Sequence, residues 1–158
     1  MEVTYNPAVI TYEKLLEVFW DSHTPDYPVT GQYASIILFH DADQESAARK
    51  SLAAREAELG TTLFTSIKPA AAFYQAEDYH QKYYLQMRRN ASDILYQLYP
   101  DYSDFVRSTA SARLNGLAGG DGDTSGIVRE LCGLKFSESV IRSLLGALGK
   151  NVDVTCVA

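Results

Sequence analysis

SIILFH, residues 35–40, is the stretch that decides the fold of this chain. It is an unbroken apolar run of β-forming residues, a pattern typical of a strand covered on both faces in the middle of a sheet. Before it, EVTYN (2–6) alternates briefly ahead of Pro7 and predicts a short first strand. After it, TTLFTSIK (61–68) alternates up to Pro69 and predicts a third strand. We therefore expect residues 35–40 to form the central strand.

Helices are predicted between these strands. Thr11 is suited to cap a helix whose apolar residues recur at helical spacing and which ends near His23, ahead of Pro25. Asp41 is suited to cap a longer helix that ends at Gly60. This alternation of strands and helices predicts an α/β (α+β) fold, with a mixed sheet and helices packed on it.

The later part of the chain has a helical pattern. Residues 78–113 carry aromatic and leucine positions at helical spacing, interrupted at Pro100. The glycine-rich stretch AGGDGDTSG (118–126) predicts a loop. Beyond it, Ser137 begins an amphipathic helix that ends at Gly149. The chain therefore ends in a helical region.

Composition narrows the classes of partner. The 158 residues, 46% of them apolar, fit a globular domain, and the net charge of −6 provides no basic stripe for a phosphate backbone. We expect no nucleic-acid partner. Neither a secretory leader nor an apolar run long enough to span a membrane is seen, so a soluble protein without membrane association is expected. Two cysteines, Cys132 and Cys156, are too few to staple a secreted fold, which favours the reducing cytoplasm, with mitochondria as the alternative.

Residue chemistry alone indicates no reaction. The glycine-rich stretch does not match G-x-G-x-x-G, and His23, His40 and His80 lack the spacing of a metal pair, so no metal is expected. The motifs G-x-S-x-G, H-E-x-x-H and C-x-x-C do not occur. FYQAEDYHQKYY (73–84) gathers acidic residues, a histidine and aromatic rings. Such a stretch fits either acid–base chemistry or a polar framework beneath a core.

Three segments, taken in order, resemble the A-type peptide methionine sulfoxide reductases. They are VTYNPAVITYEKLLEVFWDSH, GQYASIILFHDADQ and FYQAEDYHQKYY. The similarity covers residues 2–86, and STASARLNGLAGG resembles an extension found in some eukaryotic members. We therefore expect residues 1–86 to form a partial α/β domain of this family. Residues 87–158 are expected to form a helical C-terminal extension packed on it.

The resemblance implies thiol-dependent reduction of methionine S-sulfoxide in proteins or peptides. In that family a cysteine thiolate attacks the sulfoxide sulfur, while glutamate and tyrosine side chains donate hydrogen bonds to the oxygen, and a sulfenic acid forms. A second thiol then closes a disulfide, which thioredoxin or another dithiol reduces. No bound cofactor is implied. The expected partners are the oxidised methionine and thioredoxin.

Four residues are site candidates through this resemblance. Tyr33, in GQY, matches the tyrosine that hydrogen-bonds the sulfoxide oxygen, although Ala34 stands where the family has arginine. Asp26, in a shortened loop, is the candidate for the family's aspartate near the pocket. Cys132 and Cys156 lie in the C-terminal part, where the family keeps resolving cysteines, and are candidate resolving thiols.

The segment AEDYHQ matches a part of the family that builds and supports the domain. We expect it to frame the site through buried hydrogen bonds of Glu77, Asp78 and His80. Ring packing is expected from three aromatic residues, namely Phe73, Tyr74 and Tyr79.

Whether the chain is an enzyme is left open by the sequence. The family's G-C-F-W-G nucleophile segment and sulfoxide-binding glutamate would both precede Met1, so the resemblance implies an N-terminally truncated member. One alternative is a reductase by descent, whose missing segment would supply the chemistry. The other is a non-catalytic fragment or binding module that keeps part of the sulfoxide pocket. A nucleophile relocated to Cys132 or Cys156 is a third reading.

The resemblance also has a consequence for the sheet. Because the family's own first strand would precede Met1, we expect an exposed sheet edge beside residues 35–40, which invites pairing with another chain.

Overall fold

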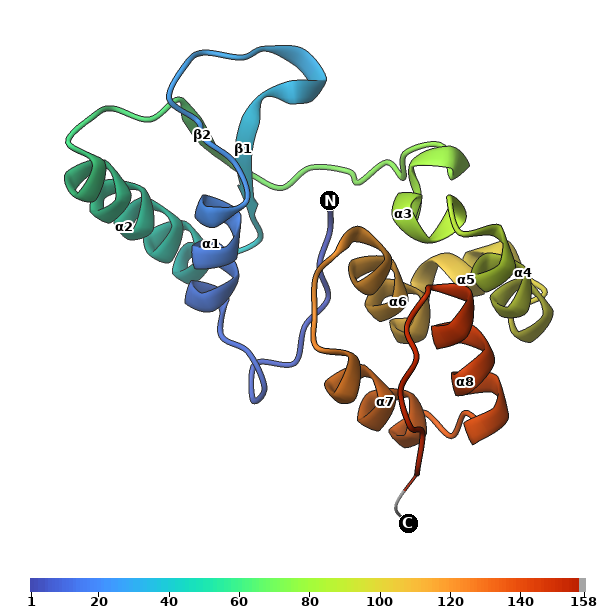
Figure 1. Cartoon of the computed structure of the whole chain (residues 1–158). Coiled ribbons are helices and arrows are strands. Elements are labelled where there is room, and N and C mark those ends of the chain that lie inside the picture. The colour runs from blue at the N-terminus through green and yellow to red at the C-terminus, as the bar shows by residue number, and fades with distance from the viewer. Residues whose placement is uncertain (157–158) are drawn as a thin grey trace. The chain divides into compact units, whose positions relative to one another are not determined.

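The structure, a computed structural model, describes residues 1–156. It divides into two compact units, an α/β unit of residues 1–74 and a helical unit that begins at Gln75 (Figure 1). Strands occur in the first unit and most helices in the second, so the expected α/β class is confirmed. The division expected between residues 86 and 87 stays a prediction.

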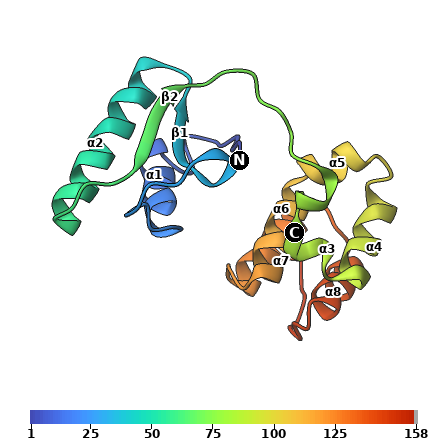
Figure 2. The ribbon, with the colours of Figure 1, turned by 90° about the horizontal axis from the view of Figure 1, so that it is seen from above.

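The α/β unit holds a sheet of two parallel strands and two long helices. Strand β1 pairs with β2 in a register that places Ser35 opposite Thr65 and Phe39 opposite Pro69. The helix between the strands, α2, runs alongside them (Figure 2). The elements of this unit are α1 (Tyr12–Asp21), the 3₁₀ turn η1 (Gly31–Tyr33), β1 (Ser35–Phe39), α2 (Ala42–Leu59) and β2 (Thr65–Pro69).

Both long helices begin at the caps that the sequence predicts. The Thr11 hydroxyl accepts the backbone N–H of Lys14 at 3.2 Å, and the Asp41 carboxylate accepts that of Gln44 at 2.8 Å. Gly60 ends α2 in the left-handed conformation, with φ of +65°. The hydrogen bonds of Thr11 and Asp41 each satisfy a backbone N–H group that the first turn of a helix leaves without a partner.

One face of the sheet carries the core of the α/β unit. Ile37 of β1 is 7% exposed and packs with residues of both helices, while the Trp20 indole donates a hydrogen bond to the Ser51 hydroxyl at 3.2 Å. This core is small. Its buried members are Leu16, Trp20, Ile37, Ala48 and Leu63.

The sheet differs from the sequence prediction in two respects. Residues 2–6 do not form a strand, because the chain instead makes a turn in which Asn6 accepts backbone N–H groups from Ala8 and Val9. β1 is covered on one face only, since Ile36 and Leu38 point away from the helices and are exposed. The prediction of a central strand covered on both faces is therefore wrong, because apolar character does not supply a covering layer.

The helical unit has its own core of leucine, isoleucine, valine and aromatic side chains. Phe105, Leu114 and Leu144 are fully buried in it. Ser137 caps the last helix, as predicted, by accepting the backbone N–H of Val140. The elements are η2 (Asp78–His80), α3 (Tyr83–Gln86), α4 (Arg89–Leu98), α5 (Tyr102–Arg107), α6 (Thr109–Gly119), α7 (Thr124–Gly133) and α8 (Glu138–Ala147).

The glycine-rich stretch is less of a loop than its composition predicts. Helix α6 continues through Gly119 and ends at Gly120, whose φ is +104°. Asp123 then caps α7, because its carboxylate accepts the backbone N–H groups of Ser125 and Gly126. The connection is therefore residues 120–123, since one aspartate at the right position starts a helix in spite of the neighbouring glycines.

No helix within residues 1–156 is both long enough and apolar enough to cross a membrane.

Candidate functional site

Tyr33 lies in the connection between α1 and β1, residues 22–34. It closes the turn η1, two residues before β1, and its side chain is 77% exposed. Gly31 makes the turn possible with a φ of +69°. The loop therefore delivers the Tyr33 side chain to the surface at the start of β1.

Asp26 occupies the other end of the same loop. Its neighbour Pro25 is buried, and the Pro25 carbonyl accepts the backbone N–H of Phe64 at 2.8 Å. Asp26 itself is exposed, and within residues 1–156 no hydrogen bond joins it to Tyr33. The structure thus places both candidates in one anchored loop, with no hydrogen bond between them among the described residues.

A chain of hydrogen bonds that sequence reasoning missed fixes the base of this loop. The His23 ring nitrogen Nε2 lies 2.7 Å from the Ser35 hydroxyl, which lies 2.8 Å from the Thr65 hydroxyl. The other ring nitrogen, Nδ1, lies 2.8 Å from the carbonyl oxygen of Phe19. The end of α1 is thereby tied to the first residues of both strands.

The direction of these bonds follows from the chemistry of the partners. The Phe19 carbonyl can only accept, so Nδ1 of His23 carries a proton, and in the neutral tautomer of the ring Nε2 accepts from Ser35. The Ser35 oxygen then accepts from Thr65. All three polar side chains are half-buried. A serine hydroxyl donating to a neutral histidine is the arrangement of an activated nucleophile, but a carbonyl here takes the place of the usual carboxylate. We therefore assign this His23 relay a supporting role.

The segment FYQAEDYH is exposed, contrary to prediction. All side chains of residues 73–80 are exposed, and the nearest oxygen of Glu77 lies 3.9 Å from His80. The backbone carries the hydrogen bonds instead. The Asp78 carbonyl accepts from the Tyr102 hydroxyl at 2.7 Å and from the Gln86 side chain at 2.8 Å. The predicted buried side-chain hydrogen bonds are therefore wrong. Of the predicted ring packing, the Tyr79 ring does contact the His80 ring, with centroids 4.2 Å apart, but at an exposed position.

Two tyrosines near Asp78 have altered acidity. Burial raises the pKa of Tyr96 and of Tyr102, and the negative charge of Asp78 raises both further. The two hydroxyls remain protonated donors, so Tyr102 holds the Asp78 carbonyl and Tyr96 donates to Gln86. These two tyrosine hydroxyls therefore help to fix the backbone at Asp78 and the side chain of Gln86.

Cys132 and Cys156 are joined by a disulfide in the helical unit. Cys132 lies on α7, and Cys156 lies in the C-terminal segment, 24 residues further on. Both side chains are half-buried against the core of this unit. The sequence left the pairing of these residues open, and the structure brings them together.

Three contacts besides the disulfide hold the C-terminal segment. Val154 is 4% exposed, and its carbonyl accepts from Arg142 of α8 at 3.2 Å. The backbone N–H of Cys156 donates to the Glu138 carboxylate at 3.0 Å, and Glu138 also pairs with Arg142 at 2.6 Å. The Glu138 carboxylate therefore links the start of α8 to the backbone of Cys156 and to Arg142.

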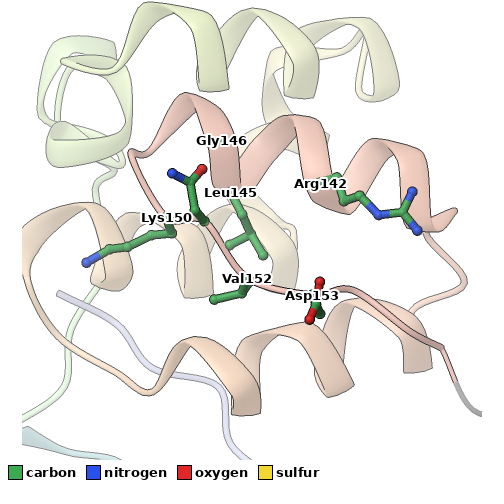
Figure 3. Close-up of a pocket in the computed structure, with 7 residues that line it drawn as sticks. Arg142, Leu145, Gly146, Lys150, Val152 and Asp153 are labelled. Atoms are coloured by element: carbon green, nitrogen blue, oxygen red, sulfur yellow. The ribbon is translucent and has the colours of Figure 1, made fainter.

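A depression of about 420 Å³ lies between α8 and this segment (Figure 3). Leu145 and Val152 face the space between α8 and the segment, whereas the Arg142 and Lys150 side chains extend away at opposite ends. Of the two basic residues that line the depression, Arg142 already pairs with Glu138, so Lys150 is the one without that partner. The depression does not include Tyr33, which belongs to the other unit. Within residues 1–156, no cluster of three His, Cys, Asp or Glu residues is placed to hold a metal ion.

Comparison with known proteins assigns the family. The family model for peptide methionine sulfoxide reductase matches residues 1–113. The chain belongs to the peptide methionine sulfoxide reductase family, and its similarity to MsrA proteins confirms the A-type assignment.

Several curated relatives are similar over part of their length. MsrA of Sulfolobus acidocaldarius is 41% identical over 90 residues, which cover 53% of this chain and 51% of that protein. MsrA of Geobacter sulfurreducens is 45% identical over 58% of this chain and 61% of its own length. The peptide methionine sulfoxide reductase of Drosophila melanogaster is 37% identical over 77% of this chain and 50% of its own length. The chain thus spans about half the length of the curated relatives it matches.

Proposed function

We propose that this chain takes part in the thiol-dependent reduction of methionine S-sulfoxide in proteins and peptides. The family match over residues 1–113 is the observation that carries the proposal. The pairing of Cys132 with Cys156 adds support, because two thiols close enough to join can pass between dithiol and disulfide forms. No bound cofactor is required.

Tyr33 is the proposed hydrogen-bond donor to the sulfoxide oxygen. A phenolic hydroxyl donates one proton, and an oxygen that gains charge or a proton as the S–O bond weakens is stabilised by such a donor. Support comes from the exposure of Tyr33 at the entrance to β1. Asp26, in the same loop, is the proposed second polar group of the pocket.

Cys132 and Cys156 are the proposed resolving thiols. A thiolate attacks the sulfoxide sulfur, methionine is released, and the oxygen remains on the attacking cysteine as a sulfenic acid. A second thiol displaces that oxygen as water and forms a disulfide. Exchange with thioredoxin or another dithiol then restores two thiols. Each cycle thus consumes one dithiol and yields methionine and water.

A reducing compartment suits this cycle. Transient disulfides of catalytic proteins occur in the cytosol, where thioredoxin-type dithiols keep thiols reduced. We therefore propose the cytoplasm as the compartment, with mitochondria as the alternative.

A second candidate function is a non-catalytic module that binds methionine sulfoxide. Its support is the Tyr33 loop by itself, which belongs to the α/β unit, whereas both thiols belong to the helical unit. Such a module would bind the sulfoxide through the Tyr33 loop without turnover.

An assay with separate S and R epimers of a methionine sulfoxide peptide tests the proposal. The full chain is incubated with dithiothreitol, and methionine is measured. Reduction of the S epimer only, abolished by Cys132→Ser or by Cys156→Ser, would show that one of the two cysteines is the attacking thiol and the other resolves it. Sulfoxide binding without turnover by the full chain would favour the module. Neither turnover nor binding would reject both functions.

Tyrosine variants test the pocket. Tyr33→Phe removes the proposed donor and is expected to weaken binding of the S epimer about fivefold, since a lost hydrogen bond costs about 1 kcal/mol. Tyr27→Phe is the matched control, because Tyr27 is an exposed tyrosine of the same loop. Equal effects of the two variants would remove Tyr33 from the site.

A further inference from the structure

The His23 ring is held in one orientation at the end of α1. Its Nδ1 lies 2.8 Å from the Phe19 carbonyl oxygen, and the ring lies against those of Phe19 and Trp20, with centroids 4.5 Å and 6.5 Å away. A hydrogen bond at one ring nitrogen fixes the place of the other. The position of Nε2 is therefore set by α1, and in the neutral ring this atom accepts from the Ser35 hydroxyl.

His23 and Ser35 stand at the two ends of the loop of residues 24–34. The distance of 2.7 Å between His23 Nε2 and the Ser35 hydroxyl closes this loop at its base. Thr65 holds the same hydroxyl at 2.8 Å, because the register of the two strands sets Thr65 opposite Ser35. The end of the loop is thus tied through one side chain to α1 and to β2.

A second anchor holds the start of the loop. The backbone N–H of Phe64 donates to the Pro25 carbonyl at 2.8 Å. Two consecutive residues, Phe64 and Thr65, therefore hold the two ends of the loop. Removing the Ser35 hydroxyl would keep the anchor at Pro25 but would untie the other end from α1.

The path from Ser35 back to Tyr33 is short. Ala34 lies between them, and its backbone N–H donates to the Gly31 carbonyl at 3.2 Å, which closes the turn η1. Gly31 adopts a φ of +69°, a conformation that other residues rarely take. A change in the position of Ser35 is therefore passed to Tyr33 through a single residue.

We propose that His23 and Ser35 are positioning residues for sulfoxide binding, which hold the Tyr33 hydroxyl where it meets the sulfoxide oxygen. This role rests on the proposed function of Tyr33. A donor that is already held in place binds its acceptor without the added cost of ordering a loop. The His23 relay itself touches no substrate. Because it acts through Tyr33, its contribution to binding should vanish when the Tyr33 hydroxyl is absent.

A double-mutant cycle on binding tests this role. The dissociation constant of a peptide with the S epimer of methionine sulfoxide is measured for the full chain, for Ser35→Ala, for Tyr33→Phe and for the double variant. Ser35→Ala should weaken binding about fivefold, and the double variant should bind no more weakly than Tyr33→Phe alone. An equal loss from Ser35→Ala with and without the Tyr33 hydroxyl would overturn the positioning role.

Two further variants serve as controls for the cycle. Ser35→Thr keeps a hydroxyl and should bind as the wild type does. Ser66→Ala removes an exposed serine of β2 outside the relay and should leave binding unchanged. All variants are compared below the unfolding transition of Trp20 fluorescence, so that each is folded. Binding by Ser35→Thr as weak as that by Ser35→Ala, or an equal loss with Ser66→Ala, would overturn the role of the Ser35 hydroxyl.

Hydrogen exchange tests the order of the loop without any ligand. The amides of Ala34 and Phe64 donate the hydrogen bonds of the loop, and both should exchange faster in Ser35→Ala, with no change in α4–α8. Unchanged exchange at Ala34 would overturn the positioning role. A wild type that does not bind the peptide would reject the proposed function and the positioning role with it. Binding that needs Tyr33, with independent effects in the cycle, would reject the positioning role alone.

Discussion

The α/β unit and the helical unit use similar lengths of chain but cover their apolar surfaces to different degrees. The helical unit buries Phe105, Leu114 and Leu144 completely. In the α/β unit the sheet has helices on one face, and Ile36 and Leu38 of β1 remain exposed on the other. Parallel strands are normally covered on both faces. The helical unit therefore encloses its apolar core, whereas the sheet of the α/β unit leaves one apolar face uncovered within residues 1–74.

The unfolding of the two units can be followed separately, because the single tryptophan lies in one of them. Trp20 is the only tryptophan of the chain and is 5% exposed in the core of the α/β unit. Its fluorescence reports that unit alone, while hydrogen exchange in α4–α8 reports the helical unit.

The largest effect is expected from Phe105→Ala in the helical core. Phe105 is fully buried against the rings of Tyr96 and Tyr102. Its truncation should lower the free energy of unfolding of this unit by about 3–5 kcal/mol. Hydrogen exchange should accelerate in α4–α8, with no shift of the Trp20 transition. Phe64→Ala, at an exposed phenylalanine, is the control. An equal shift of the Trp20 transition would show that the units unfold as one.

Removing the disulfide should have the next largest effect. The pair Cys132→Ser and Cys156→Ser releases a loop of 24 residues, which should cost about 2–4 kcal/mol in the helical unit. Exchange should rise first at the amides of Val154 and Cys156. Wild type reduced by dithiothreitol should behave in the same way. If reduction leaves exchange of these amides unchanged, the disulfide does not hold the segment.

A smaller effect is expected from breaking the His23 relay. Ser35→Ala leaves Nε2 of His23 and the Thr65 hydroxyl without their partner, which should cost about 1–2 kcal/mol in a half-buried site. The Trp20 transition should shift by this amount. Ser66→Ala, an exposed serine on β2, should shift it by much less. Equal shifts would mean that the relay contributes no stability.

The smallest effect concerns the pH dependence of α5. A hydrogen bond from the backbone of Ser103 lowers the pKa of Asp101, which caps this helix. A lowered pKa in the folded state means that the stabilisation is complete above the unfolded value of 3.8 and is lost as pH falls through the folded value. The protection factors of the α5 amides, which are exchange rates corrected for the intrinsic effect of pH, should therefore fall in acid. Asp101→Asn keeps a capping oxygen but does not titrate, so this dependence should disappear in the variant.

The parts of the fold that depend on local bonds could be predicted from the sequence. Thr11, Asp41 and Ser137 begin helices because each side chain reaches a backbone N–H three residues later. The parts that depend on distant partners could not. A strand at residues 2–6 needs a neighbour to pair with, and the pattern of EVTYN contains no information about that neighbour.

In the candidate site, too, only the features that depend on local sequence could be predicted. The position of Tyr33 at the start of β1 follows from a glycine turn ahead of an apolar run. The His23 relay does not, because only the register of β1 and β2 brings Ser35 next to Thr65. Likewise, the pairing of Cys132 with Cys156 depends on the return of the chain along α8.

The backbone anchor at Asp78 determines where mutations are tolerated. Because Gln86 and Tyr102 hold the Asp78 carbonyl, the side chains of residues 73–80 can vary without altering the path of the chain. A change at Gln86 or Tyr102 would release that path. The path of residues 73–80 therefore depends on two residues outside that segment, Gln86 and Tyr102, which lie 8 and 24 residues beyond Asp78.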